Sequence, residues 1–255
     1  MAVLRTESGV ETYAALAKDP DLHRMSGRFE HRALTDFVNR EIAAALDLHS
    51  GCALIDIGCG DGTLLASLQE RIGSGLGIVP SAAELERLNS AYRLPNLSFA
   101  QGRADAVPAE SGSFDRVIIN CVLLLLDEAE VLPCLRELKR IARPGALVWI
   151  GEVPDHDELA VKNRYRGQSL TGFLLHKWRH KGFRKAWRKA ISLLNAGNRA
   201  EVIFGQRMFW KPAEPFLALC REAGLELVWA RRHREIDDAG RVRESGTRMD
   251  YLFRA

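Results

Sequence analysis

Residues 56–62 read Asp-Ile-Gly-Cys-Gly-Asp-Gly and combine three alternating glycines with two acids. Glycine lets a backbone turn tightly and lets a ligand lie against bare peptide. The apolar run 53–57 predicts a buried strand before them, and apolar residues at 64, 65, 68 and 72 have the spacing of a helix. A helix start offers unpaired N–H groups and a positive dipole end. A turn without a ligand is the alternative, but three spaced glycines and two acids exceed what a turn needs.

The glycine spacing narrows the class of ligand. Dinucleotide sites favour G-x-G-x-x-G, whereas this chain has G-x-G-x-G and no following Gly-Lys-Ser/Thr. The run L-I-D-I-G-C-G-D-G-T at 54–63 resembles motif I of the class I S-adenosylmethionine-dependent methyltransferases. The resemblance implies that S-adenosylmethionine is the cofactor and that the turn holds its methionine portion. The residues it assigns to this turn are Asp56, Gly58, Cys59, Gly60, Asp61 and Gly62.

Two positions depart from that family. Its members usually carry an acid that hydrogen-bonds both ribose hydroxyls at the end of the second strand, where this chain has Val79. Arg103 replaces a second acid, which receives the adenine amino group. Losing a hydrogen bond to a charged group typically costs about 1.5–3 kcal/mol. Either the backbone and neighbours such as Ser81 and Asp105 hold the cofactor, or the site binds it weakly. By alignment, the residues expected along this part of the site are Val79, Pro80, Arg103 and Ala104.

The resemblance resumes at G-S-F-D, residues 112–115, where it predicts the start of the fourth strand. It places Asn120 and Cys121 at the carboxyl end of that strand, beside the transferable methyl group. Cys121 could be a nucleophile, but no histidine or other base is adjacent in the chain. A small wall residue is therefore the preferred interpretation of Cys121.

The acidic loop 151–158 leaves the fifth predicted strand and contains one histidine. Ligands of open α/β sheets sit beyond the carboxyl ends of the strands, so this loop is the best place for a general base. His156 is the candidate, since its unperturbed pKa near 6.5 leaves it mostly neutral at pH 7. Asp155 flanks it as a possible partner, and a surface histidine in a polar loop is an equally favoured alternative.

The segment before the first strand also carries polar side chains that could reach a ligand. In related methyltransferases this segment often folds over the cofactor or substrate, which would bring Arg28 and His31 to the site. A solvated helix start is the preferred interpretation of both residues.

Residues 159–200 hold eleven Lys and Arg and no Asp or Glu, although the whole chain carries only +3. Apolar residues at 183, 187, 191 and 194 have helical spacing within the basic run. We expect an inserted basic helical cap, either packed with a solvated face or facing an anionic substrate, a membrane surface or nucleic acid. Nucleic acid is disfavoured, because the rest of the chain is acidic and no appended nucleic-acid module is visible. No metal site is expected, since His176 and His180 lack a third ligand.

The chain of 255 residues, 47% of them hydrophobic, is long enough for one α/β domain with an insertion. The resemblance implies a seven-stranded, mainly parallel, doubly wound sheet. The expected parts are an N-terminal helical segment (1–50), a cofactor-binding core (51–158), the basic cap (159–204) and the last part of the sheet (205–255). The sequence shows no apolar run of about 20 residues, no secretory core and no C-x-x-C pair, so a cytoplasmic protein is expected.

The predicted function is transfer of a methyl group from S-adenosylmethionine to a small-molecule, saccharide or lipid-linked acceptor, with negative charge on the acceptor suiting the basic cap. An oxygen acceptor is preferred, because amino-methylating enzymes often show N/D-P-P-Y where this chain continues from Asn120 with Cys-Val-Leu. A binding or regulatory protein that has lost catalysis is the main alternative, and Val79 and Arg103 favour it. A nucleic-acid methyltransferase is a weaker third possibility.

Overall fold

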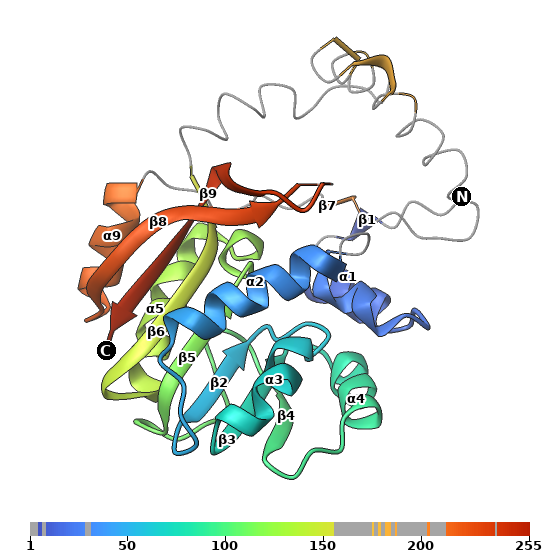
Figure 1. Cartoon of the computed structure of the whole chain (residues 1–255). Helices are drawn as coiled ribbons and strands as arrows, with labels where there is room; N and C mark the ends of the chain where they lie inside the picture. The colour runs from blue at the N-terminus through green and yellow to red at the C-terminus, as the bar shows by residue number, and fades with distance from the viewer. Residues whose placement is uncertain are drawn as a thin grey trace.

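The computed structural model describes residues 5–6, 9–28, 32–155, 175, 178–179, 182–184, 187, 203–204, 213–237 and 239–255. Its centre is a sheet of seven strands in the order β4-β3-β2-β5-β6-β9-β8, parallel except for the pairs β6–β9 and β9–β8 (Figure 1). The predicted seven-stranded, mainly parallel, doubly wound sheet is thereby confirmed. The strands are β2 (Ala53–Ile57), β3 (Ser74–Val79), β4 (Leu97–Gln101), β5 (Phe114–Asn120), β6 (Ala142–Pro154), β8 (Glu226–Ile236) and β9 (Val242–Arg254). A separate parallel pair joins β1 (Arg5–Thr6) to β7 (Ile203–Phe204).

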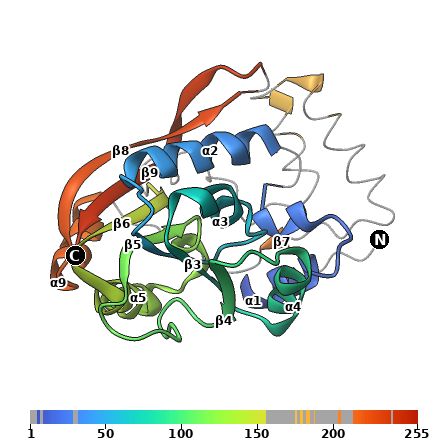
Figure 2. The same ribbon diagram turned by 60° about the horizontal axis from the view of Figure 1, so that its bottom comes forward.

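Helices cover both faces of this sheet (Figures 1 and 2). One face carries α2 (Arg32–Ala45), α3 (Thr63–Leu68) and α4 (Ala82–Ala91), whose apolar side chains join one buried cluster. The other face carries α5 (Glu128–Ile141) and α9 (Ala213–Glu222) over a second cluster. The shorter elements are α1 (Gly9–Leu16), η1 (Leu22–Ser26), η2 (Gln69–Arg71) and η3 (Leu123–Leu125).

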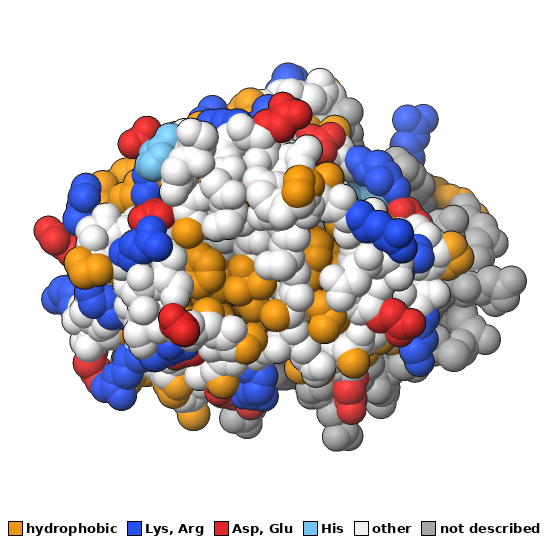
Figure 3. All heavy atoms as spheres, turned by 90° about the horizontal axis from the view of Figure 1, so that it is seen from below, with side chains coloured by type: hydrophobic (Ala, Val, Ile, Leu, Met, Phe, Trp, Pro, Cys, Tyr) orange, Lys and Arg blue, Asp and Glu red, His pale blue; other side chains and the backbone are white. Residues whose placement is uncertain are grey.

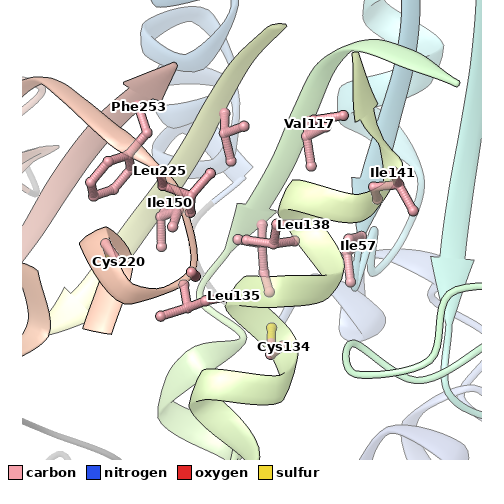
Figure 4. Packing of buried hydrophobic residues seen from close by; sticks show 14 of the residues in the cluster. Ile57, Val117, Cys134, Leu135, Leu138, Ile141, Ile150, Cys220, Leu225 and Phe253 are labelled. Atoms are coloured by element: carbon pink, nitrogen blue, oxygen red, sulfur yellow. The ribbon is translucent and has the colours of Figure 1, made fainter. Parts of the chain in front are cut away.

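Helix α5 shows how the sequence pattern becomes packing. Asp127 and Glu130 form a capping box at its start, which satisfies two backbone donors. Its apolar stripe, including Leu135 and Leu138, is fully buried against the sheet and α9 (Figure 4). Each such leucine contributes about 1.5–3 kcal/mol relative to an exposed side chain.

Strand β2 lies between β3 and β5, so both of its edges are paired. From β2 the chain continues outward to β3 and β4, whereas β5 and β6 extend the sheet on the other side. The carboxyl ends of β2 and β5 therefore flank the point where the direction of winding reverses, which is where open α/β sheets bind ligands.

The described surface mixes charges of both signs. On the face shown in Figure 3, hydrophobic side chains gather at the centre, and Lys, Arg, Asp and Glu surround them. No helix among the described residues combines the length and apolar character needed to cross a bilayer.

The expected cap at 159–204 lies almost entirely outside the described residues. Within it, Leu175, Trp178, Phe183 and Trp187 are helical and about half exposed. Phe183 contacts both tryptophans, with ring centroids 6.2 Å from Trp178 and 5.7 Å from Trp187. These exposed aromatic residues sit in the most basic part of the sequence.

Candidate functional site

A cavity of about 220 Å³ opens at the carboxyl ends of β2, β3 and β5. Its wall includes ten of the twelve residues that the sequence assigned to the cofactor: Asp56, Gly58, Cys59, Gly60, Asp61, Pro80, Arg103, Ala104, Asn120 and Cys121. Gly62 and Val79 do not line it. The motif residues are therefore brought together around one space, with two corrections.

The first correction concerns Gly62. Its φ of 73° is left-handed, and an added Cβ would lie 2.8 Å from the ring of Tyr92. This glycine makes room for α4 and β4 side chains instead of a ligand.

The second correction concerns Val79, which is completely buried in the cluster under α2, α3 and α4. Successive strand residues point to opposite faces, and its neighbours Ile78 and Pro80 both line the cavity. An acid at position 79 would thus point into the apolar core.

The glycine turn is shaped by its own protein contacts. Gly58 and Cys59 donate backbone hydrogen bonds to the carbonyl of Ile78 at 2.8 and 3.1 Å, which ties the turn to β3. Gly58 and Gly60 have φ of 75° and 56°. A Cβ on Gly60 would lie 2.9 Å from the carbonyl oxygen of Met25 in η1. Glycine here lets the N-terminal segment close over the turn as well as leaving backbone open to the cavity.

The two acids of the motif have different surroundings. Asp61 accepts from Thr63 and pairs with His23 Nδ1 at 2.9 Å, which anchors η1. Asp56 is 3% exposed, lines the cavity and receives no side-chain hydrogen bond from the described residues. Burial, reinforced by the charge of Asp61, raises the pKa of Asp56 to about 7. Asp56 is thus an acceptor with room for a polar ligand group.

Arg103 lies at the mouth of the cavity in an exposed ion-pair network. Its guanidinium binds Asp105 at 2.9 Å and Glu130 of α5 at 2.8 Å. Hydrogen bonds from Arg103 lower the pKa of Asp105, which stays ionised. Asp105, considered above as a cofactor acceptor, is therefore already engaged by Arg103.

Asn120 and Cys121 stand at the end of β5, where Asn120 pairs in register with Gly151 of β6. Trp149 Nε1 donates to the side-chain oxygen of Asn120 at 3.2 Å. Burial, with the nearby charge of Glu152, raises the pKa of Cys121 to about 11, so its thiol is neutral at pH 7. This supports a wall role for Cys121.

Beyond Cys121 lies a cluster of Arg28, Glu152 and Arg248, which the sequence did not reveal. Glu152 is 2% exposed and accepts from both arginines and, at 3.0 Å, from Asn120 Nδ2. Burial would raise the pKa of Glu152, but the positive charges of Arg28 and Arg248 hold it well below its usual range. Arg28 lines the cavity, so its interpretation as part of a solvated helix start is wrong. His31 lies outside the described residues.

An irregularity in the sheet aims Glu152 at the arginines. The β6–β9 register shifts between Ile150 and Val153, and Glu152 within the shift has a left-handed φ of 55°. Such bulges redirect side chains and recur beside active sites. Asp250 of β9 accepts from the backbone N–H of Glu152 at 2.9 Å and pairs with His233, which fixes the bulge.

The described residues do not test the predicted general base. His156 lies outside the described residues, so its role stays a prediction. Asp155 pairs with Arg232 of β8 at 2.7 Å and does not line the cavity. Its position gives no support to a direct catalytic contact.

Comparison with known proteins identifies the segment that builds the glycine turn. Residues 54–145 match the family model described as methyltransferase domain. This segment belongs to the methyltransferase-domain family. A trans-aconitate 2-methyltransferase of Deinococcus radiodurans is 33% identical over 46% of this chain and 44% of its own length. A ubiquinone biosynthesis O-methyltransferase of Xanthomonas oryzae is 27% identical over 67% of this chain and 71% of its length. Three curated relatives are matched over only 34%, 44% and 39% of their own lengths.

Solved structures extend the likeness in fold to nearly the whole chain. The N-methyltransferase NodS of Bradyrhizobium japonicum, in complex with S-adenosylhomocysteine, has a TM-score of 0.56 at 14% identity, covering 96% of this chain and 97% of its own. The [4+2]-cyclase SpnF has a TM-score of 0.54 at 19% identity, covering 81% and 63%. Since a cyclase shares the fold, the fold alone does not fix the reaction.

The match to the methyltransferase domain leaves out several residues that line the cavity or lie behind its wall. Tyr13 of α1, Arg28, Glu152 and Arg248 all fall outside 54–145. Tyr13 lines the cavity, and burial raises the pKa of its phenol, which is neutral at pH 7. No local sequence signal points to Tyr13, because α1 reaches the site only through tertiary packing.

Proposed function

We propose that the protein binds S-adenosylmethionine in this cavity and transfers its methyl group to an oxygen of a small-molecule, saccharide or lipid-linked acceptor. The observation that carries the proposal is a single cavity running from the glycine turn to Asn120 and Cys121. Two relatives, named trans-aconitate 2-methyltransferase and ubiquinone biosynthesis O-methyltransferase, add support from sequence.

The residues present fit this cofactor. The turn leaves bare backbone at Gly58 and Gly60, and Asp56 offers an unengaged carboxylate for a cationic or N–H group. Ala104 and Pro80 supply small apolar surface beside the turn, as a planar base requires. When bound, S-adenosylmethionine would supply an activated methyl group, so the chain would need chiefly to position the acceptor and exclude water.

The far end of the cavity favours an anionic acceptor. Arg28 and Arg248 share one carboxylate, that of Glu152, and so leave one positive charge in excess. Arg28 lines the cavity and offers a planar fork suited to carboxylate or phosphate. Glu152 stays ionised and hydrogen-bonded, so it would hold the arginines in place instead of accepting a proton.

Calorimetric titration with S-adenosylhomocysteine is the first test, followed by transfer of a labelled methyl group to a panel of hydroxyl- and carboxylate-bearing acceptors. Binding with transfer to one anionic acceptor is the expected result. Binding without transfer to any acceptor favours the alternative of a protein that has lost catalysis. Absence of binding overturns the proposal.

We also propose a peripheral contact between the basic segment and an anionic membrane. The exposed rings of Trp178, Phe183 and Trp187 suit the membrane interface, and each nearby Lys or Arg contributes about 1 kcal/mol of attraction to anionic lipid. Sedimentation with phosphatidylcholine vesicles, with and without phosphatidylserine, tests this at two salt concentrations. Binding only to the anionic vesicles, weakened by salt and by Trp178→Ala with Trp187→Ala, is expected. Failure to bind the anionic vesicles at low salt excludes the membrane contact.

The cytoplasmic location of the protein stays a prediction.

A further inference from the structure

A second buried carboxylate faces the cavity close to where the ribose acid is missing. Glu84 of α4 is 1% exposed and lines the cavity, five residues after Val79. It belongs to the first turn of the helix that follows β3, next to Pro80, which lines the same wall. The expected acid at position 79 thus has a substitute in the adjoining element.

The hydrogen bonds of Glu84 leave one oxygen available. Ser81, the N-cap of α4, donates from Oγ to Glu84 Oε2 at 2.6 Å and accepts from the Glu84 backbone N–H at 3.3 Å. The other oxygen, Oε1, receives no hydrogen bond from the described residues. Because Glu84 lines the cavity, a ligand bound there could donate a hydrogen bond to this oxygen.

We propose that Glu84 replaces the missing strand-end acid and accepts hydrogen bonds from the ribose hydroxyls of the bound cofactor. This inference rests on the proposed function, because it requires S-adenosylmethionine or its product in the cavity. Vicinal hydroxyls are paired donors that match one carboxylate, and Ser81 holds that carboxylate in place. The side chain of Val79 is free to fill the core because the polar contact is made from the helix.

The pH dependence of cofactor affinity gives a second test of the role of Glu84. Burial raises its pKa to about 7, against the hydrogen bonds from Ser81. The titratable groups facing it are Tyr13 of α1 and Cys59 of the glycine turn, whose own pKa values are raised by burial and which stay neutral. Ribose hydroxyls would favour the ionised carboxylate, so affinity should rise as the pH increases from 6 to 8.

Calorimetry with S-adenosylhomocysteine on the full chain tests the proposal. Glu84→Gln should weaken binding about 10- to 100-fold, as expected for loss of a charged acceptor. Glu86→Gln is the matched control, since Glu86 is exposed on the same helix, and its affinity should equal that of the wild type. An S-adenosylhomocysteine analogue without ribose hydroxyls should bind weakly to the wild type and lose nothing further in Glu84→Gln.

The outcomes distinguish a failure of the proposed function from a failure of the role of Glu84. If the wild type does not bind S-adenosylhomocysteine, the proposed function fails. If the wild type binds and Glu84→Gln binds equally well, only the role of Glu84 is overturned. Should Glu84→Gln fail to fold, the wild type decides: its pH dependence should weaken with the hydroxyl-free analogue, because only the contribution of Asp56, whose pKa is also about 7, remains. An unchanged pH dependence contradicts the inference.

Discussion

The two ends of the cavity are built in different ways. At the glycine turn, the wall comes mainly from β2, β3 and the turns that follow them, within the matched segment 54–145, and η1 closes over the turn at Met25. At the other end, the lining residues Tyr13 and Arg28 come from the N-terminal segment. Behind Arg28 lie Glu152 of β6 and Arg248 of β9, which do not line the cavity themselves. The first end is what the chain shares with its relatives. The second is built largely by residues outside the matched segment, and it is the end where the proposed acceptor would bind.

The largest effect is expected for Val79→Asp, which tests whether position 79 belongs to the cavity or to the core. Because Val79 is fully buried among apolar side chains, an unpaired carboxylate there should lower the free energy of unfolding by on the order of 3–5 kcal/mol. From the motif alignment alone, this variant would restore the family's ribose acceptor and bind the cofactor as well as or better than the wild type, whereas the buried position of Val79 predicts a loss of stability. Urea denaturation is the measurement.

Val242→Asp provides the matched control for position 79. Val242 is 50% exposed at the start of β9, so the same substitution should change stability by about 0.5 kcal/mol or less. A stable Val79→Asp protein with tighter S-adenosylhomocysteine binding would return position 79 to the ribose site.

Glu152→Gln should have the next largest effect and should act at the acceptor end. Neutralising Glu152 leaves Arg28 and Arg248 without their shared counter-charge, which should cost about 3 kcal/mol of stability. Methyl transfer should fall much further than S-adenosylhomocysteine affinity, because the cluster lies beyond the glycine turn. Chemical denaturation and parallel binding and transfer assays measure the two effects.

The pH dependence of stability sharpens this prediction. The pKa of Glu152 is depressed in the folded protein, so its pairing stabilises the fold at neutral pH and this contribution is lost as the pH falls below about 4. Glu152→Gln should remove that part of the acid sensitivity.

Glu222→Gln is the control: it breaks an exposed pair with Arg136 and should change stability by less than about 1 kcal/mol. Equal effects of the two variants would contradict a special role for Glu152.

The difference between the ends also explains what the sequence could predict. The meeting of Asp56 through Asp61 around one cavity could be predicted because strand, turn and helix follow one another within a few residues. Arg28 and Glu152 are 124 positions apart, and no local pattern encodes their meeting. The face of the sheet on which the Val79 side chain lies could have been predicted, because alternation along a strand places it opposite Ile78 and Pro80. The motif alignment overrode that signal.

The glycine turn offers a test at the cofactor end. Gly60→Ala would place a Cβ 2.9 Å from the Met25 carbonyl oxygen at a φ of 56°. The left-handed conformation should cost about 1–2 kcal/mol, and displacement of η1 should weaken S-adenosylhomocysteine binding at least about tenfold. Gly112→Ala has a similar φ of 63° with open space around it, so it should share the strain and keep the affinity. Equal loss of affinity in both variants would point to general destabilisation. Thermal melts and calorimetry separate these outcomes.

The smallest effect is expected for Arg103→Ala, at the position where the family's adenine acid is replaced. Arg103 is 57% exposed and pairs with Asp105 and Glu130 at the mouth of the cavity. Exposed ion pairs contribute about 0–1 kcal/mol, so stability should barely change. Removing the guanidinium frees Asp105, which then has an acceptor to offer the adenine amino group. S-adenosylhomocysteine affinity should therefore stay within about threefold of the wild type or rise, and Arg136→Ala, which breaks another exposed pair, is the control. A tenfold loss confined to Arg103→Ala would show that the arginine itself holds the cofactor, and the cofactor end would then depend on a residue that the family motif does not predict.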